Sequence, residues 1–159
     1  MSAAWDVAAT VVDPEIPVLT IEDLGVLRDV REHDGKVSVD LTPTYSGCPA
    51  IDAMRDDVRA ALQAAGYREV EVRTVLSPAW TTDWMTDDGK RKLREYGITP
   101  PNGRAPSPNG GRTALRMAVK CPRCDSLDTR EVARFGSTSC KALYECNACL
   151  EPFDFFKVL

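Results

Sequence analysis

Two Cys-x-x-Cys pairs near the C-terminal end constrain this chain more than any other feature. Cys121 and Cys124 form the first pair, Cys146 and Cys149 form the second, and 21 residues separate the pairs. Two cysteines three positions apart on a tight turn aim both sulfurs at one point, so two such turns complete a tetrahedral set of thiolates. The spacing predicts a structural zinc site. Iron also accepts four thiolates, and unrelated buried or disulfide-bonded cysteines are the other alternative.

The region around these pairs is predicted to be a small β-rich zinc ribbon at residues 115–159. A segment of this size buries too little apolar surface to fold stably by itself. A structural zinc supplies about 10 to 16 kcal/mol of apparent binding free energy, which becomes folding free energy. Phe153, Phe155 and Phe156 are expected to pack in the core of this ribbon.

A segment rich in proline and glycine, residues 98–114, precedes the ribbon. Proline removes backbone donors and glycine adds chain entropy, so neither a helix nor a strand is favoured there. The composition predicts a partly extended linker between a first domain at residues 1–97 and the ribbon.

The first domain alternates helical and strand patterns. The expected elements are a helix at residues 3–12, a short helix from a capping box at Thr20 and Asp23, strands at 26–31 and 36–41, a helix at 49–65, a strand at 70–75 and a helix at 87–96. Asp34-Gly35 between the first two strands is typical of a hairpin turn. The fold class is therefore predicted as α+β, a small mixed sheet covered by helices and followed by the ribbon.

Charge and hydropathy exclude several classes of partner. Residues 1–97 hold 18 acidic and 11 basic residues, and residues 115–159 hold 6 acidic and 7 basic residues. Neither part shows the clustered cations that phosphate binding requires, so no nucleic acid partner is expected. The sequence shows no secretory signal and no run of eighteen apolar residues, which predicts a cytoplasmic protein without a membrane span.

Two cysteines lie outside the four paired ones. Cys48 directly precedes the helix that starts near Pro49, where unpaired amides and the helix dipole favour an anion, so a lowered thiol pKa is predicted. A small, partly buried residue at the helix start is the alternative. Cys140, next to Lys141, is a candidate second exposed thiol; its alternatives are a buried or incidental cysteine and a metal ligand in place of Cys146.

Other residues often found in active sites have simpler interpretations. His33, the only histidine, falls at the hairpin turn and is expected on the surface. Trp80 and Trp84 are expected to pack in the core, with a partner-binding face as the alternative. The chain shows no phosphate-binding loop, dinucleotide fingerprint or Ser-His-Asp set, so the acid–base machinery of an enzyme is not visible.

Several motifs resemble a known family. DPEIPV at residues 13–18, DLG at 23–25 and SGCP at 46–49 resemble the small domain shared by cytosolic and bacterial iron–sulfur cluster assembly factors. With residues 80–84 and 96–101 and the segment FGSTSCK at 135–141, the whole chain resembles the PaaD family, accessory proteins of the phenylacetyl-CoA epoxidase system.

The resemblance implies a function. It implies a non-catalytic accessory role in aerobic phenylacetate breakdown, in which the protein helps to mature the ring-epoxidising monooxygenase, including its iron–sulfur flavin reductase. Cys48 matches the family's characteristic cysteine and would hold a transient iron–sulfur cluster, with Cys140 as a second candidate thiol. Components of the epoxidase system would be the protein clients, and a homodimer is compatible with the sequence. The alternatives are a structural or scaffold subunit of the epoxidase complex, or a thiol-dependent enzyme or electron carrier.

Overall fold

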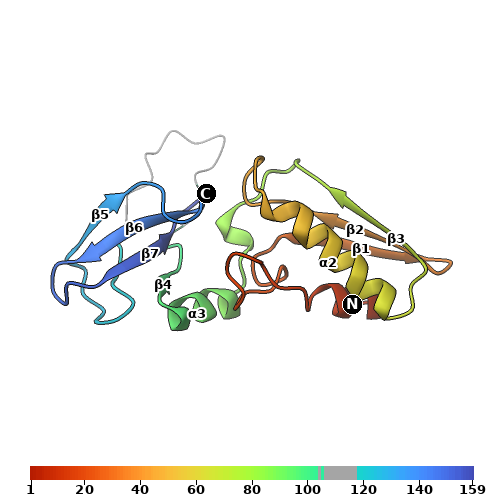
Figure 1. Cartoon of the computed structure of the whole chain (residues 1–159), viewed down its shortest axis with the longest axis horizontal. Coiled ribbons are helices and arrows are strands. Elements are labelled where there is room, and N and C mark those ends of the chain that lie inside the picture. Colours follow the sequence, from red (N-terminus) through yellow and green to blue (C-terminus); the bar gives the residue numbers. More distant parts are fainter. Residues whose placement is uncertain (104, 106–117) are drawn as a thin grey trace. The chain divides into compact units, whose positions relative to one another are not determined.

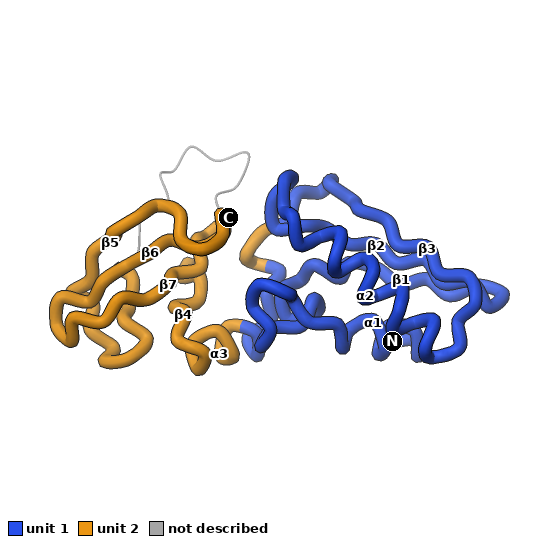
Figure 2. The backbone as a smooth tube through the Cα atoms, viewed as in Figure 1, with its two compact units in different colours: residues 1–80, 84–89 blue, residues 81–83, 90–159 orange. Residues whose placement is uncertain are grey.

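The structure is a computed structural model that describes residues 1–103, 105 and 118–159 (Figure 1). It divides into two compact units, which are coloured separately in Figure 2. Unit 1 comprises residues 1–80 and 84–89, and unit 2 comprises residues 81–83 and 90–159. Among the described residues, no helix has both the length and the apolar character that crossing a bilayer requires.

Unit 1 contains a mixed three-stranded sheet with helices against it. Its elements are α1 (Ala3–Ala8), β1 (Leu27–His33), β2 (Lys36–Leu41), α2 (Ala50–Ala64) and β3 (Glu69–Thr74). The sheet order is β1-β2-β3, in which β1 pairs antiparallel with β2 and β2 pairs parallel with β3. Parallel neighbours need a crossover connection, which α2 provides as it lies across the sheet (Figure 1). The predicted mixed sheet covered by helices is confirmed.

Helix α2 packs through one face. Its buried residues Ala50, Met54, Val58 and Leu62 recur every four positions, the spacing that keeps side chains on one side of a helix. The helix ends where the amide of Gly66, with φ of 103°, donates to the Gln63 carbonyl. This packing fixes the start of α2, and with it Cys48, against the core of unit 1.

The hairpin of unit 1 forms as predicted. Asp34 and Gly35 both have positive φ, at 50° and 77°, the combination that a two-residue type I′ turn needs. The side chain of His33 beside this turn is 90% exposed, which confirms a surface position.

Two predicted helices of the N-terminal region differ from the structure. Helix α1 ends at Ala8 instead of residue 12, and Val12 forms an isolated antiparallel bridge with Thr20. The capping box is present, since the Thr20 amide donates to Asp23 and the Asp23 amide donates to the Thr20 hydroxyl, but no helix follows. The segment forms a single turn that ends at Gly25, whose φ is 72° and whose amide donates to the Glu22 carbonyl.

Trp80 and Trp84 lie near this turn. Trp80 is 6% exposed and its Nε1 donates to the Leu24 carbonyl at 2.9 Å, so the prediction of core packing is confirmed for Trp80. Trp84 stacks under the guanidinium of Arg28, 3.6 Å from its ring centroid. The backbone of Trp84 also lies so close to Gly25 that a Cβ there would approach its carbonyl oxygen to 2.5 Å.

Unit 2 is built on a four-stranded sheet. Its strands are β4 (Ile98–Thr99), β5 (Thr129–Ala133), β6 (Lys141–Cys146) and β7 (Pro152–Phe156), in the order β4-β7-β6-β5. The short 3-10 helix η1 (Thr82–Trp84) and α3 (Asp87–Tyr96) each have residues in both units. The core of the ribbon contains Phe153, Phe155 and Phe156, all at most 8% exposed, which confirms their predicted packing.

The predicted linker is partly wrong. Ile98 and Thr99 were expected in an irregular segment, yet they form β4 and pair parallel with Asp154 and Phe155 of β7. Both residues are buried, and the Thr99 hydroxyl donates to the Lys120 carbonyl at 2.6 Å, so burial and pairing override the adjacent prolines. Most of the remaining linker and residues 115–117 of the expected ribbon lie outside the described residues.

Candidate metal centre and separate thiols

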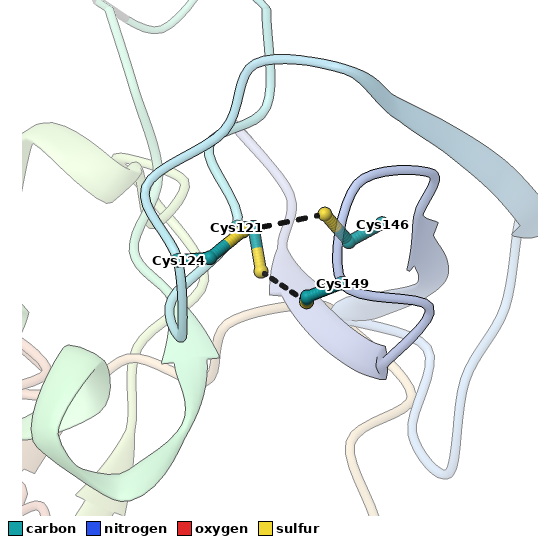
Figure 3. A group of neighbouring side chains, drawn as sticks. All are labelled: Cys121, Cys124, Cys146 and Cys149. Atoms are coloured by element: carbon teal, nitrogen blue, oxygen red, sulfur yellow. Dashed lines mark hydrogen bonds between the residues drawn. The ribbon is translucent and has the colours of Figure 1, made fainter.

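The four paired cysteines converge on one point in unit 2. Their sulfurs all lie within 4.8 Å of one another, with 3.8 Å between Cys121 and Cys149 and 3.6 Å between Cys124 and Cys146 (Figure 3). Thiolates arranged tetrahedrally around zinc at about 2.3 Å are separated by about 3.8 Å. The donor set and its spacing therefore fit a four-coordinate metal ion.

The two knuckles repeat one backbone design. In the first, the Cys121 amide donates to the Ser126 carbonyl and the Asp125 amide donates back to Cys121; in the second, Cys146 pairs with Glu151 and Leu150 in the same two ways. Asp125 and Leu150, four residues after the first cysteine of each knuckle, both have φ of 63°. The two knuckles therefore have the same backbone geometry. Each one presents its two sulfurs in the same way, so that together they form one four-sulfur site.

Backbone amides also point at the sulfurs. Amide hydrogen bonds, chiefly that from Cys149, lower the pKa of the Cys146 thiol to about 7. At Cys124 an amide hydrogen bond from Ser126 acts in the same direction, but the contact with Cys146, burial and the other two sulfurs outweigh it and raise its pKa to about 12. In the metal-free site the Cys124 thiol thus keeps its proton near neutral pH, and a metal must displace it.

Cys48 lies where the sequence predicts, directly before α2, but its protonation differs from the prediction. The residue is 8% exposed, and burial raises the pKa of its thiol. The Ala50 amide and the Thr44 hydroxyl hydrogen-bond the sulfur and act in the opposite direction, while the carboxylates of Glu15 and Asp13 add to the increase. The predicted lowering is therefore wrong, because burial and two nearby negative charges outweigh the helix N-terminus.

Cys140 is buried at 5% exposure, so the prediction of a second exposed thiol is wrong and the buried alternative is correct. Its sulfur lies 3.0 Å from the Thr138 hydroxyl at the turn between β5 and β6. Burial lowers the pKa of Lys157. Cys140 lies close enough to Lys157 to act in the opposite direction.

The structure places further residues that the sequence did not single out. Lys141 is 5% exposed and its ammonium pairs with Asp154 at 3.6 Å. Gly136 lies so close to this pair that a Cβ would approach Asp154 Oδ1 to 3.1 Å. The glycine and the alternation of charged with apolar residues were the only signals in the sequence, and they did not indicate that Lys141 is buried in an ion pair with a half-buried Asp154.

Comparison with known proteins shows the same two-part organisation. Residues 105–157 match the PaaD zinc beta ribbon domain, and residues 2–74 match the iron-sulfur cluster assembly protein family. A protein of Escherichia coli, named as one of the subunits of 1,2-phenylacetyl-CoA epoxidase, is 48% identical over 98% of this chain and 91% of its own length. The chain belongs to the PaaD family. This PaaD family member thus joins an assembly domain to a ribbon that carries the four-cysteine cluster.

Two other relatives cover the assembly domain of this PaaD family member. An Fe-S protein maturation auxiliary factor of Porphyromonas gingivalis is 37% identical over 53% of this chain and 81% of its own length. The crystal structure of a domain of unknown function, DUF59, from Bacillus anthracis superposes with a TM-score of 0.53 and 28% identity over 57% of this chain and 87% of that chain. A solved structure therefore shares the mixed α/β fold over 57% of this chain.

Proposed function

We propose that this protein is an accessory factor in the maturation of iron–sulfur proteins and that its client belongs to the phenylacetyl-CoA ring-epoxidising monooxygenase. The observation that carries this proposal is the 48% identity to the E. coli epoxidase subunit over nearly the whole chain. The match of residues 2–74 to iron–sulfur cluster assembly proteins and the similarity to maturation auxiliary factors support the chemistry.

In this proposal Cys48 is a transient ligand for an iron–sulfur unit as cargo. Burial, Glu15 and Asp13 raise the pKa of its thiol, so the resting site is protonated and unreactive at neutral pH. The two carboxylates that disfavour a thiolate also favour a cation beside it. An arriving iron centre therefore replaces the proton, and cargo is released when a client offers better ligands.

The four-cysteine cluster has a separate, structural role in the proposal. We assign zinc to Cys121, Cys124, Cys146 and Cys149, because the ribbon family is named for this metal and the sulfur spacing fits it. The bound zinc would hold the two knuckles together and stabilise the sheet of unit 2. Cys140 remains a secondary candidate, since it lies outside residues 2–74, the part of the chain that matches the iron–sulfur cluster assembly proteins.

The proposed factor is non-catalytic and acts in the cytoplasm on protein clients. All six cysteines are free in the structure, as a reducing compartment would keep them. A scaffold subunit that stabilises the epoxidase complex is the second candidate, and the description of the E. coli relative as a subunit favours it. The two functions differ in whether Cys48 matters.

The test is to produce the iron–sulfur reductase component of the epoxidase together with this protein, with its Cys48→Ser variant or with a Ser46→Ala control. Ser46 is exposed two positions before Cys48, so its loss leaves the site chemistry intact. Iron and sulfide per reductase should fall only with Cys48→Ser. A full cluster content with that variant rejects transfer through Cys48, and stoichiometric copurification unaffected by it would favour the scaffold.

A further inference from the structure

The two units carry opposite net charges. Unit 1 holds 16 acidic and 7 basic residues, a formal net charge of −9, whereas unit 2 holds 8 acidic and 13 basic residues, a net charge of +5. Four of those bases occur together in α3, at positions 90, 91, 92 and 94. The domain boundary predicted at residue 97 assigns these four bases to the acidic first domain, so the opposite net charges of the two units were not apparent from the sequence.

A pocket of about 260 Å³ lies within unit 2, where the end of α3 and β4 meet the first knuckle. Two cations, Arg94 and Lys120, line it together with Pro100, Pro101 and Pro122. None of the described residues that line the pocket is acidic. Among the described lining residues, proline rings thus supply the apolar surface and the net charge is positive.

The two cations of the pocket share one counterion. Arg94 Nη2 lies 2.9 Å and Lys120 Nζ lies 3.5 Å from the same oxygen, Asp125 Oδ1. The side chains of Arg94 and Lys120 are both about half exposed. One carboxylate neutralises only one of the two charges, so a positive charge remains in excess beside the pocket.

The other polar side chains of the pocket are directed at the backbone. The Thr99 hydroxyl donates to the Lys120 carbonyl at 2.6 Å, and Asn102 Nδ2 donates to the Ala118 carbonyl at 3.1 Å. Proline has no amide hydrogen to offer. Recognition in this pocket therefore depends on the guanidinium, the ammonium and the apolar ring surfaces.

We propose that this pocket docks an acidic segment of a protein partner. A carboxylate of the segment pairs with Arg94 and Lys120, and a neighbouring apolar side chain packs on the proline rings. The pocket is smaller than sites for whole small molecules, which span about 300 to 1,000 Å³, and this favours side chains of a peptide as occupants. Proline walls favour a peptide over a free phosphate, which gains nothing from apolar contact. This docking requires neither Cys48 nor a cluster, so it holds or fails independently of the proposed maturation activity.

The experiment uses the full-length, zinc-loaded protein and a fluorescent peptide of repeated Glu-Glu-Leu units, with the corresponding Gln-Gln-Leu peptide, pyrophosphate and single-stranded DNA as competitors. Arg94→Gln and Lys120→Gln should each weaken binding by roughly two- to fivefold, the range for an exposed ion pair. Asp125→Asn should strengthen binding, because it frees both cations. Asparagine tolerates the positive φ of this position, which keeps the knuckle intact.

Arg130→Gln is the matched control, because it removes one positive charge from the same unit at an exposed side chain that pairs with Glu145. It should leave the affinity unchanged, and the affinity of the wild type should fall as salt is added. Equal losses in Arg130→Gln and Arg94→Gln, or equal binding of the glutamine peptide, would overturn the proposal. The proposal would also be overturned if pyrophosphate or DNA displaced the fluorescent peptide at lower concentrations than the unlabelled acidic peptide does.

Discussion

Cys121 Sγ lies 3.8 Å from Cys149 Sγ, although the two residues are 28 positions apart and belong to different knuckles. Cys121 is fully buried and packs in one apolar cluster with Cys146, Phe153 and Phe155. The cysteine site and the aromatic core of the ribbon are therefore one structure, and a metal bound at the sulfurs would also stabilise the core around them.

Removal of the metal should unfold the ribbon. Cys149→Ser, or a strong chelator, is expected to remove one zinc per chain and the thermal transition of unit 2, because binding energies of about 10 to 16 kcal/mol are coupled to folding at such sites. Metal analysis and circular dichroism give the readouts. Cys48→Ser is the matched control and should keep both the zinc and the transition; retention of metal by Cys149→Ser would contradict the four-cysteine assignment.

Zinc affinity should increase with pH. The pKa of Cys146 is lowered to about 7 and that of Cys124 is raised to about 12, so zinc displaces a proton from Cys124 throughout the neutral range and an additional one from Cys146 below pH 7. Competition with a chelator at several pH values should show a slope that becomes steeper below pH 7. An affinity independent of pH between 6 and 8 would show that the thiols are already deprotonated.

Alkylation of Cys48 should be slow at neutral pH. Burial, with Glu15 and Asp13, raises the pKa of this thiol, so the reactive thiolate becomes abundant only at alkaline pH. Peptide mapping after iodoacetamide treatment separates Cys48 from the other cysteines. Glu15→Gln removes one of the charges that raise the pKa and should increase the rate near neutral pH, whereas fast alkylation of the wild type at pH 7 would disprove a protonated resting site.

Gly25 should tolerate substitution less well than Gly35. Both have positive φ, at 72° and 77°, but a Cβ on Gly25 would come within 2.5 Å of the Trp84 carbonyl oxygen and a Cβ on Gly35 meets nothing within 4 Å. Backbone strain alone predicts a loss of about 1 to 2 kcal/mol for Gly35→Ala. Added overpacking predicts roughly 2 to 5 kcal/mol for Gly25→Ala. Denaturant titration measures both, and equal losses would contradict the close contact.

Local signals in the sequence located most elements of unit 1. The hairpin depends on Asp34-Gly35, and α2 on the four-residue spacing of Met54, Val58 and Leu62, so neighbours in the chain suffice to predict them. The capping box at Thr20 was also predicted correctly as a set of hydrogen bonds. The helix expected after it is absent, because the chain turns at Gly25, where its backbone packs against Trp84, about sixty positions away in the sequence.

Long-range packing explains what the sequence did not indicate. Strand β4 depends on pairing with β7, more than fifty residues later, while local prolines suggest an irregular linker. The direction of the Cys48 pKa depends on Glu15 and Asp13, which a helix-terminus argument does not include. The four-cysteine cluster was predictable because each knuckle is local, and only the meeting of the two knuckles requires the fold.

The most direct test is the metal and sulfide content of the protein after reconstitution with iron and sulfide without oxygen. The wild type is expected to carry one zinc at the cysteine cluster and additional iron and sulfide, which Cys48→Ser loses while it keeps the zinc. One zinc with no iron or sulfide in either protein would contradict the claim that Cys48 holds iron–sulfur cargo.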